Sequence, residues 1–399
     1  MQQNRVLVAG MGIISALGQG QDENLQALRR KASGLGHTRH ISTIYHDKLP
    51  VGEIALDNAT LLANLGLTDA PGNYTRTTLL GITALQEALD QSGIDITAYR
   101  TGLINASTVG GMSDVENIYA DLIDPATPGN GLADTIDCAD CTERMAQHFG
   151  IKDWRATIST ACSSSANAVM YGARLIKAGM LDVAICGGTD ALTRFTINGF
   201  NSLKNTDQQP CRPFDADRNG LNLGEAAAFL VLVSEKLNPA HVLAELSGYC
   251  NFNEAFHPTA PSPEGDGAYQ AMNGAIRMAG IEPSAVSYIN VHGTATLNND
   301  LSEGMAMKRL FGNTPPAFSS TKPYTGHTLA AAGAVEAVFS LLSLQNGEIF
   351  PSLNFTTPMP ELDLTPATNW QQEVSIQHVL SNSFGFGGNN ASLLFSRYA

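Results

Sequence analysis

Short apolar runs alternate with longer amphipathic segments along the chain, and each kind of segment predicts a different element. Apolar runs of about four to eight residues bounded by glycine or polar residues are typical of buried strands. Leucine and isoleucine recur at helical spacing in residues 75–91, and Gly93 follows as a stop signal. We expect helices at 75–91, 166–177 and 328–344, and strands at 5–9 (ended by Gly10), 183–186 (ended by Gly187), 226–233, 286–291 and 391–395.

This mixed order of strands and helices predicts an α/β fold in which helices cover buried strands. The 399 residues exceed the ~100–200 of one domain, so we expect two domains or one duplicated unit. Ser159-Thr160 and Ser320-Thr321 each precede a helix of small residues, which is a weak sign of duplication. The polar break at 234–239 then predicts an N-terminal half at 1–237 and a C-terminal half at 238–399.

Composition narrows the functional classes. A formal net charge of −14 argues against the basic patch of a nucleic-acid-binding surface. Six cysteines in a chain of this length do not indicate a disulfide framework. The N-terminus lacks the order of a signal peptide, and the apolar stretch 329–344 is shorter than the ~20 residues of a membrane span. We therefore expect a cytoplasmic protein that binds neither nucleic acid nor membrane.

Two short patterns favour neither a cofactor nor a metal when their surroundings are included. Gly10-Met11-Gly12 lacks the third glycine of a dinucleotide-binding loop. Cys138-Ala-Asp-Cys141 has no second ligand pair for zinc, and the neighbouring aspartates disfavour a redox thiolate. We expect no metal site.

Cys162 is the strongest candidate nucleophile. An apolar approach ends in Thr-Ala-Cys162-Ser-Ser-Ser, and a predicted helix follows directly. Free backbone N–H groups and the positive dipole end of a helix N-terminus favour a thiolate there. A buried inert cysteine is the alternative for such a residue taken alone. Two histidines elsewhere in the chain favour the nucleophile.

The first histidine, His292, ends a predicted strand and precedes Gly293. Strand ends in α/β folds are where ligands bind. Thr294 and Thr296 add hydroxyls that suit a polar ligand.

The second histidine, His327, lies at the start of the predicted helix 328–344, with Lys322 before it and Glu336 inside the helix. A buried carboxylate needs a partner, and Lys322 or an ordered water can supply one. A plain helix-start histidine is the alternative.

Three glycines surround Phe384 and Phe386 in the C-terminal run 382–389. Such a turn can direct backbone N–H groups at one point, which is the geometry of an oxyanion hole. An ordinary turn between strands is the alternative. Taken together, the thiolate, the two imidazoles and the backbone N–H pair of this turn indicate one acyl-binding site.

Four motifs, in this order, resemble the β-ketoacyl-acyl-carrier-protein synthases, the elongating ketosynthases of fatty-acid and type II polyketide pathways. They are Thr-Ala-Cys-Ser-Ser at 160–164, His-Gly-Thr-x-Thr at 292–296, Lys-x-x-x-Gly-His at 322–327 and Gly-Phe-Gly-Gly at 385–388. The resemblance covers nearly the whole chain. It implies a thiolase fold: two similar α/β halves in αβαβα layers, usually dimeric.

The resemblance also implies a reaction. Cys162 takes an acyl chain from a carrier-protein thioester, and His292 and His327 stabilise the enolate formed as malonyl-carrier protein loses carbon dioxide. The carbanion then attacks the acyl-cysteine. The resemblance further implies an oxyanion hole from the N–H groups of Cys162 and Phe386, and support of the two histidines by Lys322 and Glu336. It implies that Thr294 and Thr296 contact the phosphopantetheine arm, that Phe386 gates the acyl pocket and that Val109 limits its depth. Asp300 and Glu303 match a structural acidic pair of the family.

The implied partner is an acyl carrier protein, whose phosphopantetheine carries the substrates, and no further cofactor is implied. Elongating fatty-acid members carry a Lys/Arg cluster before the helix at 75–91, whereas the segment 65–76 here contains one basic residue, Arg76. Docking charge is then expected from Lys204, Arg212 or Arg174, or from a partner subunit.

Two further departures concern the pathway. Pro323-Tyr324 and Asn298-Asn299 replace the forms common in fatty-acid members. They favour a secondary-metabolite ketosynthase, such as an aryl polyene type. We expect a homodimer, or a heterodimer with a ketosynthase-like chain-length factor.

Other functions fit less well. A CoA-dependent thiolase uses a second cysteine in its C-terminal glycine-rich segment, and residues 382–390 contain none. Initiating ketosynthases pair cysteine with histidine and asparagine, and His327 argues against that group. A non-catalytic subunit resembling a chain-length factor typically replaces the nucleophile, which is present here. A cysteine hydrolase fits a Cys/His pair but not the two further motifs.

Overall fold

The computed structural model of the protein describes residues 4–68, 74–122 and 131–398. Eleven strands of these segments form one mixed sheet in the order β4-β3-β5-β6-β1-β7-β11-β10-β8-β9, with β2 paired to β1. The strands are β1 (Val6–Ser15), β2 (Gly18–Gln19), β3 (Thr101–Ala106), β4 (Trp154–Ile158), β5 (Val183–Asp190), β6 (Ala226–Ser234), β7 (Ala244–Asn253), β8 (Tyr288–Asn290), β9 (Ala317–Ser319), β10 (His378–Gly385) and β11 (Asn389–Ser396).

The α-helices vary widely in length. They are α1 (Gly20–Arg29), α2 (Asn58–Asn64), α3 (Arg76–Ser92), α4 (Met112–Val115), α5 (Tyr119–Leu122), α6 (Cys138–Phe149), α7 (Ser164–Lys177), α8 (Arg194–Ser202), α9 (Asp266–Ala279), α10 (Leu297–Phe311), α11 (Lys322–Thr325) and α12 (Ala332–Asn346). Short 3₁₀ turns include η3 (Glu235–Leu237) and η5 (Leu329–Ala331).

The two halves of the sheet repeat one topology. In the first half β3 is parallel to β4 and β5, while β6 is antiparallel to β5 and β1. In the second half β8 is parallel to β9 and β10, while β11 is antiparallel to β10 and β7. The halves meet where β1 pairs with β7. This repeat confirms the predicted duplicated α/β architecture, while the boundary after residue 237 stays a prediction.

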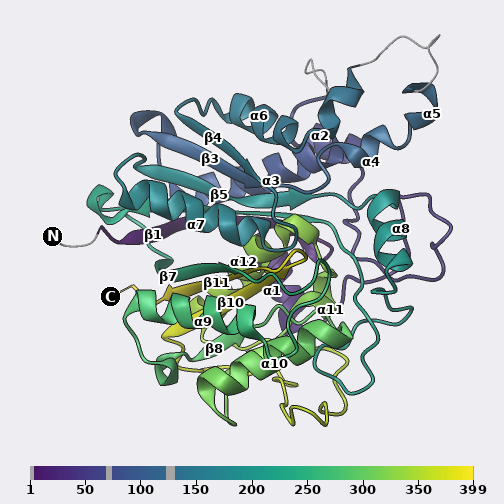
Figure 1. Ribbon diagram of the computed structural model, residues 1–399. Coiled ribbons are helices and arrows are strands. Elements are labelled where there is room, and N and C mark those ends of the chain that lie inside the picture. The colour runs from purple at the N-terminus through teal and green to yellow at the C-terminus, as the bar shows by residue number, and fades with distance from the viewer. Residues whose placement is uncertain (1–3, 69–73, 123–130, 399) are drawn as a thin grey trace.

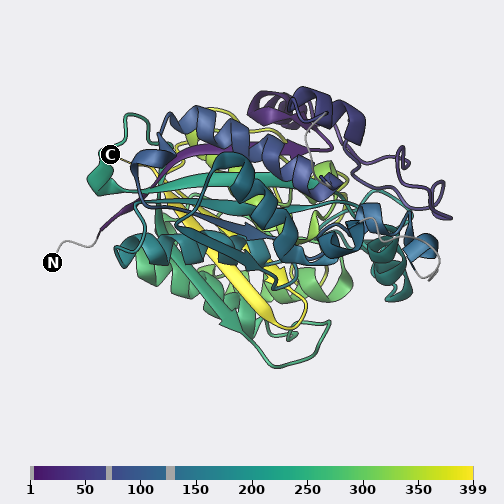
Figure 2. The same cartoon turned by 90° about the horizontal axis from the view of Figure 1, so that it is seen from above.

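Helices and strands stack in five layers (Figure 1). In that view α6 and α3 lie above the first set of strands, α7 and α12 lie between the two sets, and α9 and α10 lie below the second. Figure 2 looks down on these layers, so the helices of the upper layer lie over the strands. The segment Leu329–Asn346 is long and apolar enough to cross a membrane, but 89% of it is buried inside the protein, which makes it a core helix.

Glycine did not end the strands where the sequence indicated. β1 continues past Gly12 to Ser15, and β5 continues past Gly187 to Asp190. A Cβ atom on Gly12 would overlap the carbonyl oxygen of Ala84 in α3, and one on Gly187 would overlap that of Ala228 in β6. These glycines permit close packing rather than a turn. The prediction of the strand ends was therefore wrong, and the correction brings Asp190 to the end of a strand.

The predicted helix at 75–91 is confirmed as α3, where Thr75 Oγ1 caps the N-terminus and Gly93 ends the helix in a left-handed conformation. The predicted helix 328–344 is instead divided into η5 and α12. Leu329 has a φ of 52°, which an α-helix does not allow, so the chain turns once before the long helix begins.

Candidate active site

Cys162 lies in the turn that joins β4 to α7, directly before the N-cap Ser163. Ala161 adopts a left-handed conformation with a φ of 53°, which turns the chain sharply at this point. Ser164 holds the turn, because its Oγ donates to Ala161 O (2.5 Å) and accepts from Thr160 N (2.8 Å). The cysteine is therefore placed at a helix N-terminus and is 5% exposed.

A cavity of about 200 Å³ opens beside this cysteine. Six of the residues predicted from sequence line it: Cys162, His292, Thr294, Thr296, His327 and Phe386. The segments that follow strands β4, β8 and β10 meet at this cavity. Three other predicted residues, Lys322, Glu336 and Val109, are buried and do not line the cavity.

The two histidines face each other in this cavity. Their ring centroids are 5.4 Å apart and the ring planes are nearly perpendicular. Lys322 lies behind His292, where its Nζ donates to the His292 carbonyl oxygen (2.5 Å) and lies 3.3 Å from His292 Nδ1. The same ammonium forms an ion pair with Glu336 of α12. One buried charge pair therefore supports the first histidine.

These contacts fix the proton on one imidazole. An ammonium can only donate, so Nδ1 of His292 accepts and the neutral ring carries its proton on Nε2. Burial, with the Lys322 charge next, holds the pKa of His292 well below its usual range. Burial and Lys322 do the same for the pKa of His327, whose Nδ1 has no hydrogen-bond partner among the described residues. Both rings are therefore neutral hydrogen-bond donors near pH 7.

Cys162 differs from the thiolate that its sequence context favoured. Burial raises the pKa of its thiol to about 11, although the charge of Lys322 and a hydrogen bond from the backbone N–H of Phe386 both lower it. The resting nucleophile is therefore a thiol, and its proton leaves during the reaction.

The glycine-rich turn between β10 and β11 lies against the nucleophile. A Cβ on Gly385 would lie 2.9 Å from Thr160 O and 3.3 Å from Cys162 N, so glycine permits this approach. Asn389 secures the turn, because its Oδ1 accepts hydrogen bonds from three side chains of neighbouring elements. The donors are Ser163 Oγ (2.7 Å), Asn167 Nδ2 (2.8 Å) and Asn251 Nδ2 (2.7 Å).

Two buried carboxylates of α10 shape the segment after His292. Glu303 accepts the backbone N–H groups of His292 and Gly293, both at 2.9 Å. Asp300 accepts the N–H of Ala295 (3.2 Å), which has a φ of 64°. The chain consequently bends sharply and places Thr294 Oγ1 within 2.8 Å of Thr296 Oγ1 at the cavity wall.

The apolar surroundings of the site include a residue that the sequence did not indicate. Phe200 of α8 stacks on Phe386 with ring centroids 5.7 Å apart. Phe200 also packs against an apolar cluster formed by residues of several loops, of α8 itself and of η5. The buried members of this cluster are Leu49, Val51, Val109, Leu192, Ile197, Leu221, Leu223 and Leu329. Nothing in the helical pattern around Phe200 separates a site residue from a packing residue.

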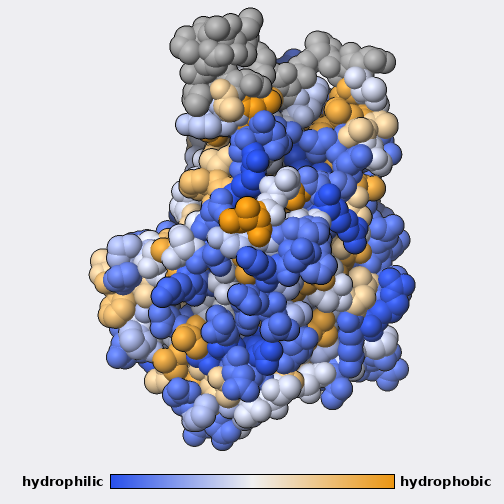
Figure 3. All heavy atoms as spheres, turned by 90° about the vertical axis from the view of Figure 1, so that its right-hand side faces the viewer, coloured by the Kyte–Doolittle hydropathy of each residue, from blue (hydrophilic) through white to orange (hydrophobic). Residues whose placement is uncertain are grey.

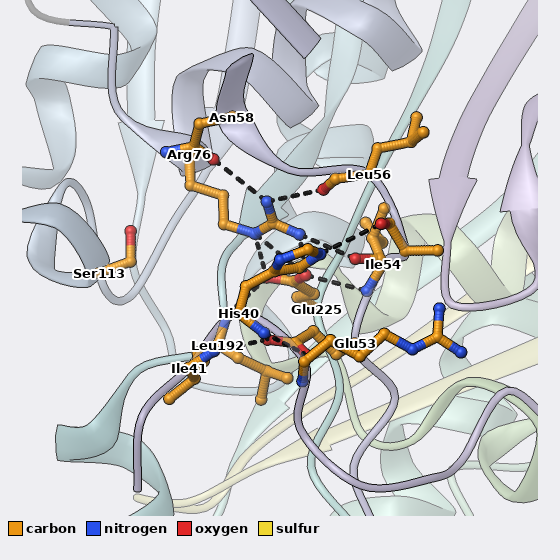
Figure 4. A network of polar contacts seen from close by, with 12 residues as sticks. His40, Ile41, Glu53, Ile54, Leu56, Asn58, Arg76, Ser113, Leu192 and Glu225 are labelled. Atoms are coloured by element: carbon orange, nitrogen blue, oxygen red, sulfur yellow. Dashed lines mark hydrogen bonds and ion pairs between the residues drawn. The ribbon is translucent and has the colours of Figure 1, made fainter. Parts of the chain in front are cut away.

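The basic residues expected to receive a carrier protein lie in different settings. Residues 69–73, part of the segment 65–76, lie outside the described residues. Arg76 is 5% exposed and forms an ion pair with Glu225, while its guanidinium also donates to the carbonyl oxygens of Ile54 and Leu56 (Figure 4). This arginine is therefore part of the interior. Lys204, which follows α8, lines the cavity.

Elsewhere, Arg174 lies over the ring of Tyr249, and Arg212 is partly buried. The face on the α8 side of the molecule is mostly hydrophilic, with small separate hydrophobic patches (Figure 3). Phe195 and Leu203, at the two ends of α8, are 65% and 50% exposed.

Family comparisons match almost the whole chain. The model of the beta-ketoacyl synthase N-terminal domain matches residues 3–238, and that of the beta-ketoacyl synthase C-terminal domain matches residues 243–356. A 3-oxoacyl-acyl-carrier-protein synthase 2 of Staphylococcus aureus is 34% identical over 413 residues, covering 100% of this chain and 99% of the relative. A protein of the same name from Synechocystis is 31% identical over 415 residues, with the same coverage.

Solved structures agree with this match. The ishigamide ketosynthase/chain length factor superposes with a TM-score of 0.92 at 29% identity, covering 100% of both chains. A ketosynthase in complex with its chain length factor from Xenorhabdus doucetiae superposes with a TM-score of 0.85 at 32% identity, covering 100% of this chain and 99% of that one.

Proposed function

This chain belongs to the β-ketoacyl synthase family of acyltransferases, and from that premise we propose that Cys162, His292 and His327 carry its condensation of an acyl chain with a malonyl unit. The observation that carries this proposal is one cavity that contains a thiol, a backbone N–H directed at its sulfur and two neutral imidazoles. The supporting roles proposed for Lys322 and Glu336 follow from the contact of Lys322 with His292 and from the ion pair that Lys322 forms with Glu336.

The first step is transfer of the acyl chain. Cys162 Sγ attacks the carbonyl carbon of the carrier-bound thioester, and the N–H groups of Cys162 and Phe386 receive the oxyanion. The carbon–sulfur bond to the carrier then breaks, and the proton of the Cys162 thiol ends on the released phosphopantetheine thiol. Phe386, which stacks on Phe200, is proposed to act as a gate for the acyl chain.

The second step is decarboxylation and carbon–carbon bond formation. The bond to the malonyl carboxylate breaks, carbon dioxide leaves, and the electron pair forms an enolate. N–H donors of His292 and His327 meet the charge that develops on the enolate oxygen. The enolate carbon attacks the acyl-cysteine, and the bond to Cys162 Sγ breaks, which returns the thiol after protonation.

The substrates determine the proposed partners. Thr294 and Thr296, with their hydroxyls at the cavity wall, are proposed to contact the phosphopantetheine arm of an acyl carrier protein. We propose no cofactor beyond that arm, because each step moves electron pairs only within the two thioesters. The relatives are named 3-oxoacyl-acyl-carrier-protein synthase 2, and the similar Xenorhabdus ketosynthase is complexed with a chain length factor. A homodimer or such a heterodimer in the cytoplasm is proposed here.

A reconstituted reaction tests this function. The purified protein, with its candidate partner subunit in a parallel sample, is incubated with acyl-carrier protein and malonyl-carrier protein. We expect a carrier-bound 3-oxoacyl product two carbons longer than the acyl substrate. Product formed equally well by Cys162→Ala would contradict the proposal, because that change removes the nucleophile and little volume.

A further inference from the structure

Asp190, the last residue of β5, holds together two loops from different halves of the chain. Its side chain is fully buried. Oδ1 accepts hydrogen bonds from Ser107 Oγ (2.8 Å) and from the backbone N–H groups of Thr108 (2.9 Å) and Val109 (3.3 Å). Oδ2 accepts hydrogen bonds from Thr108 Oγ1 (2.5 Å) and from the backbone N–H of Ala330 (2.8 Å).

Each of these loops carries a residue of the proposed reaction. Val109 belongs to the apolar cluster that continues from Phe200. Ala330 follows His327 by three residues, and Leu329 between them has a φ of 52° and packs in the same cluster as Val109. The segment after His327 therefore has an unusual backbone, and Asp190 provides its side-chain anchor.

We propose that Asp190 is a positioning residue for condensation, which fixes the depth of the acyl pocket through the loop 107–110 and the place of His327 through Ala330. This inference rests on the proposed function. A carboxylate that receives five donors can hold both loops at once, because charge-assisted hydrogen bonds are the strongest of their kind. Acyl-chain length and decarboxylation then depend on one side chain that touches neither substrate.

The two oxygens allow the two effects to be separated. Asp190→Asn keeps Oδ1 for Ser107 Oγ and for the N–H groups of Thr108 and Val109. Its NH₂ group takes the place of Oδ2, where the Thr108 hydroxyl can turn to accept it, but it also faces the Ala330 N–H, and two donors cannot bond. Ser107→Ala acts on the other loop alone, because it removes one bond to Oδ1 and the acceptor of the Gly110 N–H (3.0 Å).

A matched control is available in Asp215, which is also fully buried. Its Oδ2 accepts the backbone N–H groups of Thr356 (2.6 Å) and Thr357 (2.9 Å), so Asp215→Asn also breaks backbone contacts. These contacts lie outside the loops that Asp190 joins. Asp215→Asn therefore reports the effect of a lost buried carboxylate alone.

The test measures the rate of Cys162 acylation, the rate of carbon dioxide release from malonyl-carrier protein, and the product lengths from a panel of acyl chains. For Asp190→Asn we expect the ratio of decarboxylation to acylation to fall by about 10-fold to 100-fold, as a small misplacement of a catalytic group can do. Ser107→Ala shifts the product lengths and leaves that ratio unchanged. Asp215→Asn changes neither quantity.

An unchanged ratio in folded Asp190→Asn, or unchanged product lengths in Ser107→Ala, would overturn the inference. A wild-type protein that is never acylated would instead overturn the proposed function. If Asp190→Asn does not fold, Asp190→Ser tests the same contact, because its shorter side chain adds no bulk and cannot reach both the Ala330 N–H and the loop 107–110.

Discussion

Replacement of Lys322 by methionine tests how the charge pair behind His292 works. Lys322 and Glu336 have side chains that are 2% and 3% exposed. Glu336 Oε1 is paired with Lys322, and Oε2 has no hydrogen-bond partner among the described residues. Methionine keeps most of the lysine stem, so the change removes the charge with little loss of packing. Breaking such a pair costs about 3–5 kcal/mol of unfolding free energy.

The loss of unfolding free energy in Lys322→Met should depend on pH, because the Glu336 carboxylate can become neutral by binding a proton. Burial raises the pKa of the Glu336 carboxyl, and the charge of Lys322 opposes that rise. Without Lys322 the folded-state pKa moves further above the usual 4.5. At pH values between the usual pKa, which applies to the unfolded chain, and the raised pKa of the folded variant, the native protein holds a proton on Glu336 that the unfolded chain has released. The unfolding free energy of the variant therefore falls as pH rises, by up to about 1.4 kcal/mol per pH unit.

Urea denaturation at pH values of about 5.5 and about 8 measures this directly. Wild type, Lys322→Met and the double variant Lys322→Met/Glu336→Gln are compared. We expect a larger loss for Lys322→Met at the higher pH and partial recovery in the double variant, because glutamine carries no charge. An equal loss at both pH values, or a double variant no more stable than the single one, would refute the reasoning.

The same substitution has a catalytic consequence. Nδ1 of His292 loses the donor that keeps the ring proton on Nε2. Decarboxylation should then fall by about 100-fold to 1,000-fold, as after loss of one oxyanion donor. Carbon dioxide release from malonyl-carrier protein is the measurement, and an unchanged rate would refute the assignment of that proton.

Three further outcomes are expected. His327→Ala should slow carbon dioxide release by about 100-fold or more and Cys162 acylation much less; equal losses in the two assays would contradict this division. The acylation rate should rise about tenfold per pH unit between about pH 7 and about pH 9, because the thiol of Cys162 has a pKa raised to about 11. The decarboxylation rate should stay flat from about pH 6.5 to about pH 8, because the pKa values of His292 and His327 are lowered well below 6.5. Parallel pH profiles of the two rates would contradict this expectation. Gly385→Ala should lower acylation by about tenfold or more, because its Cβ would lie 3.3 Å from Cys162 N; wild-type adduct formation would count against the packing argument.

Much of the site could be predicted from sequence because its chemistry lies in local motifs. Cys162, His292 and His327 are each marked by small or glycine neighbours at the end of a strand or the start of a helix. The segments that follow the strands line one cavity, so positions at strand ends were enough to group these residues. Their catalytic roles remain predictions that the experiments above test.

Contacts between distant segments could not be predicted in the same way. Asp190 follows two glycines that resemble a turn, and only the packing of β6 and α7 against them shows that the strand continues. Phe200 reaches Phe386 across 186 positions of sequence, within an ordinary helical pattern. The protonation of Cys162 also depends on burial, which a helix-start position alone does not report.

Intact mass spectrometry tests the central claim most directly. The purified protein is mixed with an acyl-carrier protein, and then malonyl-carrier protein is added, with Cys162→Ala as the matched control and a candidate partner subunit in a parallel sample. We predict one acyl adduct on Cys162 in the wild type and its disappearance after the second addition, as the extended chain moves to the carrier. An adduct on the Cys162→Ala variant, or none on the wild type in the presence of its partner, would contradict the account.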